Sequence, residues 1–247
     1  MISHVFAIST AMVFFLRSLS LPPPPPPFQG WPEVIVNPVG PTENNKKGTG
    51  ASTDPDRINF YMYYSTMYKD SREKALAVAV SNNGFAFSKA GAVRFVGGDG
   101  IVDTLDGGGR ARCNVVRRAT LNENDGLWEE EEGNNSWMMF YEGVSIEDGR
   151  HRILAAESED LRTWRKLGLA LDVGGRRAGG DGGGGEVAWD SRGVGSPHVI
   201  RLDDGYFRMY YTGEGADGRT AIGVARSADM RVWQREKVVE LSSLLNR

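Results

Sequence analysis

The run YFRMYYTG at 206–213, the turn ADGR at 216–219 and the run TAIGVARS at 220–227 decide the fold of this chain. The first run is dense in aromatic and large apolar residues, whereas the second contains mainly small ones. Asp217-Gly218, which lies between them, is a strong signal for a two-residue hairpin turn. The stretch therefore predicts two antiparallel strands that are neighbours in a sheet.

The same pattern occurs twice more along the chain. Aromatic runs stand at 58–65 (INFYMYYS) and 136–143 (SWMMFYEG), and small-residue runs follow at 75–81 (ALAVAVS) and 152–158 (RILAAES). In every copy a serine ends the second run and an aromatic residue follows six positions later; these pairs are Ser81 and Phe87, Ser158 and Trp164, and Ser227 and Trp233. A spacing that recurs three times indicates an internal repeat.

The repeat extends upstream of the aromatic runs. DGGGRARCNVV at 106–116 aligns without gaps on DSRGVGSPHVI at 190–200, and GWPEVIV at 30–36 is a weaker third copy. With a further strand after each Phe or Trp, every unit contains four strands. Four antiparallel strands in a repeat of roughly 50–70 residues are typical of a β-propeller blade. We expect an all-β fold with blades at about 30–96, 103–173 and 187–241.

The segments outside the repeat are expected to be loops or targeting sequence. The Gly-rich stretch 174–185 and the acidic insertion 121–135 are predicted loops, and 28–247 is the predicted partial propeller. Residues 1–27 contain no acidic residue, and their apolar run at 5–16 is shorter than the about 20 residues of a membrane span. This segment suits a secretory signal or an organellar (plastid) transit peptide, followed by a proline spacer, so no membrane association is expected after targeting.

Composition excludes several classes of protein. The net charge of −3 and the isoelectric point near 5.7 argue against a nucleic-acid partner. The single cysteine, Cys113, cannot form an internal disulfide framework. The three histidines, His4, His151 and His198, lie far apart and form no local metal-binding motif, so the sequence implies neither a metal nor another cofactor. Oligomeric state is not indicated by composition.

The repeat units also carry a family resemblance. DSRGVGSPHVIRLDDGYFRMYYTG, followed by GRTAIGVARSADMRVW, resembles the five-bladed β-propeller superfamily of arabinanases, levansucrases and invertases, and more narrowly the family 43/32-like glycoside hydrolases. The resemblance covers about residues 30–241. It implies a five-bladed type of propeller of which about three blades are present, and a carbohydrate substrate or ligand. Because a propeller ring closes with about 4–8 blades, we expect either a partial chain or an assembly of several chains.

In that superfamily an Asp-Pro at the start of an inner strand supplies a nucleophile or base, and an Asp and a Glu on other blades complete the site. This chain departs from the pattern, since the corresponding pairs are Trp31-Pro32, Arg112-Cys113 and Ser196-Pro197. Glu33 stands one residue beyond the first pair. The departure leaves two functions open: a glycosidase that hydrolyses O-glycosidic bonds, or a non-catalytic propeller that binds a glycan or a protein.

Three carboxylates are the catalytic candidates of the glycosidase hypothesis, since glycoside hydrolysis needs two carboxyl groups across the scissile bond. Asp106 and Asp190 precede two of the inner strands, and each either has a role in the site or caps the turn into the strand. In the site, Asp190 would act as base or charge-tuning partner. Glu142 stands where the other copies have Ser65 and Thr212, so it is the candidate acid.

Five further residues are candidates for substrate binding. His198 and Asn114 share one inner-strand position, and Arg112 could hold an anionic group. The structural alternatives are a buried histidine for His198 and a solvated or blade-bridging arginine for Arg112. Trp31 and Trp189 lie near the starts of repeat units, where an aromatic ring could contact a sugar. Trp164 and Trp233 recur at a repeat position and are expected in the core.

Overall fold

The computed structural model describes residues 29–36, 58–68, 73–98, 100–121, 128–130, 137–175 and 187–239. The predicted targeting segment 1–27 and most of the Gly-rich loop lie outside the described residues, so both stay predictions. Among the described residues, no helix has the length and apolar character needed to cross a bilayer.

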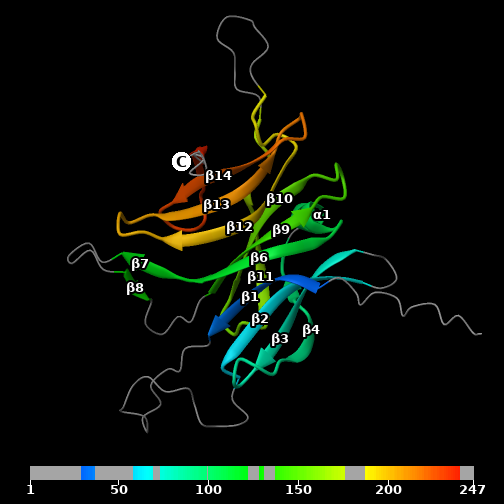
Figure 1. Cartoon of the computed structure of the whole chain (residues 1–247), viewed down its shortest axis with the longest axis vertical. Helices are drawn as coiled ribbons and strands as arrows, with labels where there is room; N and C mark the ends of the chain where they lie inside the picture. The colour runs from blue at the N-terminus through cyan, green and yellow to red at the C-terminus, as the bar shows by residue number, and fades with distance from the viewer. Residues whose placement is uncertain are drawn as a thin grey trace, which may run out of the picture.

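Three sheets of four antiparallel strands, one for each repeat unit, form the main part of the described fold (Figure 1). The first blade has the strands β1 (Gln29–Val36), β2 (Phe60–Met67), β3 (Lys74–Ser81) and β4 (Ser88–Ala92). The second has β6 (Arg110–Arg117), β9 (Trp137–Val144), β10 (His151–Ser158) and β11 (Thr163–Leu171). The third has β12 (Gly193–Arg201), β13 (Phe207–Glu214), β14 (Thr220–Ser227) and β15 (Gln234–Val238). The predicted all-β, propeller-type fold is confirmed.

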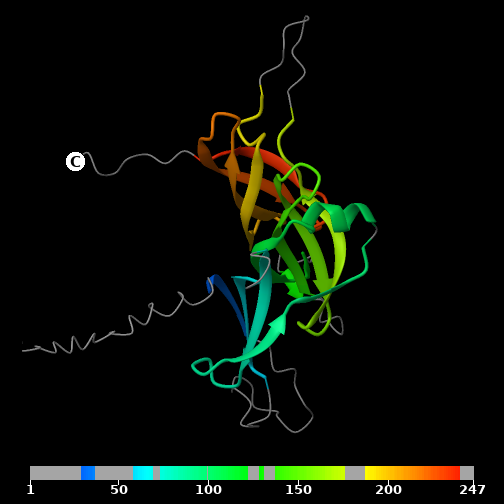
Figure 2. The ribbon, with the colours of Figure 1, turned by 90° about the vertical axis from the view of Figure 1, so that its right-hand side faces the viewer.

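The first strands of the three blades come together at one side of the molecule. β6 contacts both β1 and β12, and in Figure 1 these three strands follow one another from the first blade to the third. Figure 2 shows the blades from the side, fanned about these strands. We call β1, β6 and β12 the inner strands, as the sequence predicted for the segments that precede each aromatic run.

Two details differ from the sequence-based expectation. The segment after Phe87 was expected to form one outer strand, but it divides into β4 and β5 (Arg94–Val96), and β5 pairs in parallel with β11 of the second blade. The register of β4 with β3 shifts between Lys89 and Gly91, and Gly91, with φ of 105°, pairs with Val78 just beyond this irregularity. A short helix, α1 (Gly100–Asp106), then leads to β6, and β7 (Ala119–Leu121) pairs with β8 (Trp128–Glu130) inside the predicted loop insertion.

The blades pack face to face through their aromatic strands. In β9, alternate side chains point to opposite faces of the sheet. Met139 and Tyr141 belong to the core shared with the first blade, and Met138 and Phe140 belong to the core shared with the third. All four are buried, because the second blade lies between the other two.

The recurrent serine at the end of each third strand builds the next turn. Ser158 Oγ accepts the main-chain N–H groups of Asp160 and Leu161, and Asp160 in turn accepts those of Arg162 and Thr163. The same contacts occur around Ser81 and Asn83 in the first blade and around Ser227 and Asp229 in the third. The serine therefore recurs because its hydroxyl satisfies turn N–H groups that the strands cannot pair.

Candidate functional site at the inner strands

Each inner strand has a distorted residue at the same repeat position, two or three residues after its start. Trp31, Arg112 and Ser196 have φ values of 50°, 37° and 52°, although none is glycine, and each lies in a bulge where the register with the neighbouring strand shifts. A left-handed conformation at a non-glycine residue costs about 1–3 kcal/mol and is commonest at functional sites. These are the positions at which the resemblance implies a catalytic Asp.

A hydrogen bond across each blade junction holds the bulge in place. Arg112 donates its main-chain N–H to Ser65 Oγ of the first blade at 2.9 Å. Ser196 donates its main-chain N–H to Glu142 Oε2 of the second blade at 3.1 Å. Ser65 and Glu142 occupy the same repeat position. The Ser65 hydroxyl at the first junction and the Glu142 carboxylate at the second both accept the main-chain N–H of the bulge residue in the following blade.

A second row of junction contacts lies further along the inner strands. Glu33 Oε1 accepts the Val115 N–H at 3.3 Å and the Asn114 side-chain amide at 2.8 Å. Asn114 Oδ1 then accepts the Val199 N–H of the third blade at 2.8 Å. His198 occupies the position in β12 that corresponds to Glu33 and Asn114, and its side chain is exposed. The buried-histidine alternative does not apply to it.

Glu142 has the densest set of partners in this region. Its Oε1 lies 2.7 Å from His151 Nδ1, and its Oε2 lies 3.2 Å from Arg112 Nη1, which also donates to Ser196 Oγ at 3.0 Å. Gly195 is required here, because a Cβ at this residue would lie 2.3 Å from the carboxylate. Burial by itself would raise the pKa of Glu142, but the contacts with His151, Arg112 and the Ser196 N–H outweigh it and lower the pKa below its ordinary value.

The pKa of Glu33 is shifted in the opposite direction, above its ordinary value. Its partial burial raises the pKa above the ordinary carboxyl value, because the hydrogen bonds from Val115 and Asn114 and the charge of nearby His198 offset only part of the desolvation. Two carboxyl groups on neighbouring blades thus differ in acidity: the pKa of Glu142 is lowered and the pKa of Glu33 is raised. Such divergence is typical of acid and base pairs in active sites.

Trp31 supplies an aromatic surface beside these carboxyl groups. The Arg112 guanidinium lies 4.2 Å from the centre of the Trp31 ring, within cation–π distance. The Trp31 side chain is nevertheless 47% exposed. The first and second blades therefore present a stacked pair, one member aromatic and the other charged, next to the bulges.

Asp106 and Asp190 lie elsewhere, each behind the aromatic strand of its own blade. Asp106 accepts hydrogen bonds from Arg110, Tyr141 and Lys166 at 2.7–2.9 Å. Asp190 accepts hydrogen bonds from Tyr211 at 3.0 Å and from Arg235 at 2.8 Å. Burial opposes ionisation of Asp106, but its cationic partners prevail and its pKa is lowered. Both carboxylates are buried. Their hydrogen bonds connect the segment that precedes the inner strand to other strands of the same blade.

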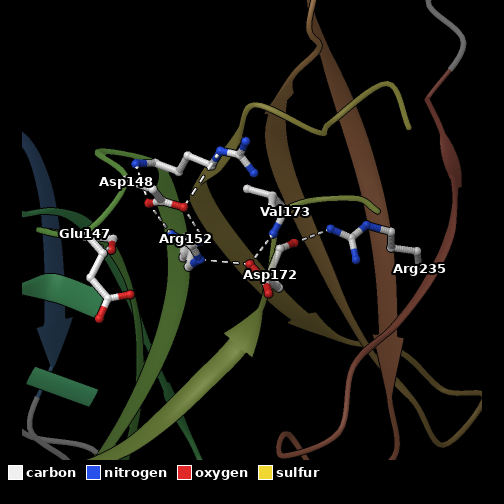
Figure 3. A network of polar contacts seen from close by, with 8 residues as sticks. Glu147, Asp148, Arg152, Asp172, Val173 and Arg235 are labelled. Atoms are coloured by element: carbon white, nitrogen blue, oxygen red, sulfur yellow. Dashed lines mark hydrogen bonds and ion pairs between the residues drawn. The ribbon is translucent and has the colours of Figure 1, made fainter. Parts of the chain in front are cut away.

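Trp189 belongs to this outer region too, since its ring stacks on Tyr211 with 5.8 Å between centroids. Trp189, Asp190 and Arg235 line part of a cavity of about 480 Å³ at the third blade, together with residues of the segment that follows β11. Figure 3 shows how Arg235 continues into a polar network: it donates to the Asp172 carbonyl, and Arg152 joins the Asp172 and Asp148 carboxylates.

The structure therefore brings together five of the eight predicted site residues: Trp31, Arg112, Asn114, Glu142 and His198. It separates Asp106, Asp190 and Trp189 from them. Glu33, Ser65 and His151 join the group without having been predicted as site residues. Glu33 could have been found from the sequence, because it aligns with Asn114 and His198 in the repeat. Within the described ranges, no group of three or more His, Cys, Asp or Glu residues could hold a metal ion.

Comparisons with known proteins give only distant structural neighbours. The sequence matches no protein-family model and no curated protein. A glycosyl hydrolase from Bacteroides ovatus aligns with a TM-score of 0.46 and 19% identity over 72% of this chain and 45% of its own. The β-1,2-mannobiose phosphorylase from Listeria innocua aligns with a TM-score of 0.46 and 16% identity over 71% of this chain and 40% of its own.

A third neighbour comes from the GH130 family of mannoside phosphorylases, described as containing glycoside hydrolases that target β-1,2-mannosidic linkages in Candida mannan. It aligns with a TM-score of 0.46 and 18% identity over 72% of this chain and 45% of its own. This chain spans about half the length of these proteins. We take its function from its own residues.

Proposed function

We propose that the surface formed by Trp31, Glu33, Arg112 and His198 binds a carbohydrate; we call it the axial surface. Buried Asn114 supports it by holding Glu33 in place. The observation that carries this proposal is the exposed Trp31 ring stacked on Arg112. An aromatic ring can cover the C–H face of a sugar, while convergent polar groups bind its hydroxyls, and this combination of apolar area with a few placed polar groups is typical of ligand sites.

The surroundings of Arg112 support the proposal. Its main-chain N–H is bound by Ser65, and its guanidinium contacts both Glu142 and Ser196. The group is therefore held in one orientation before any ligand arrives, which reduces the entropic cost of binding. The paired Glu142 neutralises its charge, so a neutral glycan fits this surface better than an anionic one.

Isothermal titration calorimetry of the whole chain with arabino-, xylo-, fructo- and manno-oligosaccharides tests this assignment. We expect saturable binding of at least one member, weakened at least tenfold by Trp31→Ala. The matched control is Phe85→Ala, which removes an aromatic ring that is 94% exposed in a turn of the first blade. Binding that survives Trp31→Ala unchanged, or equal losses in both variants, would overturn the assignment.

A second function, glycoside hydrolysis, is favoured by the opposite pKa shifts of Glu33 and Glu142. In this scheme Glu33 donates a proton to the glycosidic oxygen as the C–O bond breaks, and ionised Glu142 stabilises the positive charge that develops on the sugar. Water then adds to the anomeric carbon and returns a proton to the Glu33 carboxylate, so that the acid is regenerated. Glu33 takes the acid role that the sequence suggested for Glu142, because the contacts of Glu142 favour its ionised form. Asp106 and Asp190 are assigned here to strand positioning.

Hydrolysis is tested by incubating the same oligosaccharides with the whole chain and measuring released reducing ends. Glu33→Gln should abolish turnover while leaving glycan binding within about threefold, since the amide keeps the shape of the carboxyl group. Asp190→Asn is the matched control and should keep turnover if the protein remains folded. Binding without turnover in the wild-type chain would leave the protein a glycan-binding propeller.

A further inference from the structure

Each occupied blade junction joins two defined faces. The forward face of a blade contacts the next blade along the chain, and the rear face contacts the preceding one. On forward faces, Leu76 of the first blade and Ile153 of the second are 3% and 0% exposed. Beside them lie Ser65 and Glu142, which accept the N–H of the following bulge. One apolar residue and one hydrogen-bond acceptor thus characterise a forward face.

The forward face of the third blade carries the same two features, and no described blade covers it. Ile222 pairs with Thr212 across β13 and β14, as Leu76 pairs with Ser65 and Ile153 with Glu142. Ile222, however, is 40% exposed. His198, at the position of the acceptors Glu33 and Asn114, is also exposed on this blade.

The rear face of the first blade is apolar and only half-buried. It presents Phe60, Met62 and Tyr64 from β2. The corresponding rear-face residues of the third blade are of the same three types, and they are fully covered by the second blade: Phe207, Met209 and Tyr211. The rear face of the first blade therefore has the same composition as the rear face by which the third blade packs on the forward face of the second.

We propose that the rear face of the first blade in one copy of this chain docks on the forward face of the third blade in a second copy. Phe60, Met62 and Tyr64 would cover Ile222, while Thr212 and His198 would accept main-chain N–H groups of the partner's inner strand. The contact continues the junction that the chain already repeats twice. Because it joins two different faces, it is heterologous and generates a closed ring or an open chain of copies.

Sedimentation velocity of the whole chain over a hundredfold concentration range measures this association. We expect either a discrete oligomer or a series of species that grows with concentration. Ile222→Arg blocks the forward face and Met62→Arg blocks the rear face, so each variant by itself should be monomeric. A mixture of the two should form a 1:1 dimer and nothing larger, because one intact face of each kind remains.

Val232→Arg is the matched control: it places the same charge on a residue that is 75% exposed in a turn of the third blade, and it should associate like the wild type. Thr212→Ala provides a milder variant, with at least a tenfold weaker self-association and an unchanged thermal midpoint. A wild-type chain that stays monomeric throughout, or a mixture of the two blocked variants that fails to dimerise while both are folded, would overturn the proposal.

Discussion

Glu142 of the second blade accepts the main-chain N–H of Ser196 in the third blade at 3.1 Å. Ser65 has the same relation to Arg112 one blade earlier, at 2.9 Å. Both donors belong to left-handed bulge residues that have no strand partner at that point. At both junctions, a side chain of the preceding blade thus accepts the N–H of the bulge residue. This side chain is the neutral Ser65 at the first junction and the carboxylate of Glu142 at the second.

The first prediction concerns the stability of this junction. Glu142→Ala should lower the free energy of unfolding by about 3–5 kcal/mol, because it leaves the Ser196 N–H and the Arg112 charge without their buried partner. Glu142→Gln should cost less, since the amide oxygen can still accept the N–H. Urea denaturation followed by tryptophan fluorescence measures both. Glu147→Ala, an exposed glutamate of the same blade, should be neutral, and a similar loss there would contradict the assignment.

The second prediction is a pH dependence at the same residue. Because the pKa of Glu142 is lowered in the folded protein, its contribution to stability is fully present above its ordinary value of 4.5 and is lost as the pH falls through the folded-state pKa. The stability difference between wild type and Glu142→Gln should therefore be largest at neutral pH and shrink in acid. A difference that stays constant from pH 7 to about pH 3 would show that the carboxylate charge contributes nothing.

The third prediction is a pH dependence of stability at Glu33, which has the opposite sign to that at Glu142. The pKa of Glu33 is raised by burial, so its ionised form destabilises the folded protein at neutral pH, and this cost disappears as the pH falls below its ordinary value of 4.5. Glu33→Gln keeps an acceptor for the Val115 N–H and removes the charge. We expect its thermal midpoint to exceed that of the wild type at pH 7 and to approach it in acid. A lower midpoint at pH 7 would contradict the burial argument.

The fourth prediction distinguishes the two aspartates. Asp106→Asn should lower the free energy of unfolding by about 3–5 kcal/mol, because two cations, Arg110 and Lys166, lose their buried counter-charge. Asp190→Asn should cost less, since Asp190 contacts one cation, Arg235, in the described part of the chain. Asp217→Asn, at an exposed turn, is the control. Equal losses at Asp106 and Asp190 would show that the number of cations is irrelevant.

The strand pattern of this protein follows from its sequence, because the signals are local. A run of eight residues dense in aromatic and large apolar side chains, followed by a turn such as Asp217-Gly218 and a second run of small residues, predicts antiparallel neighbours from adjacent residues only. The gap-free alignment of 106–116 on 190–200 placed Arg112 and Ser196 at one repeat position, and the weaker copy at 30–36 placed Trp31 there. Their left-handed backbone was not predicted, since no glycine marks it.

The membership of the site depends on contacts between blades. Asn114 meets Glu33 from 81 residues away and the Val199 N–H from 85, and no local pattern specifies which junction residue faces which. Glu142 looked like a departure from the repeat, but its oxygen fills the place of the Ser65 hydroxyl. Asp106 and Asp190 precede inner strands in the sequence, yet they turn toward Tyr141 and Tyr211 of their own sheets. Packing of one sheet on the next decides these pairings, because a buried polar group takes whichever partner that packing brings within hydrogen-bond distance.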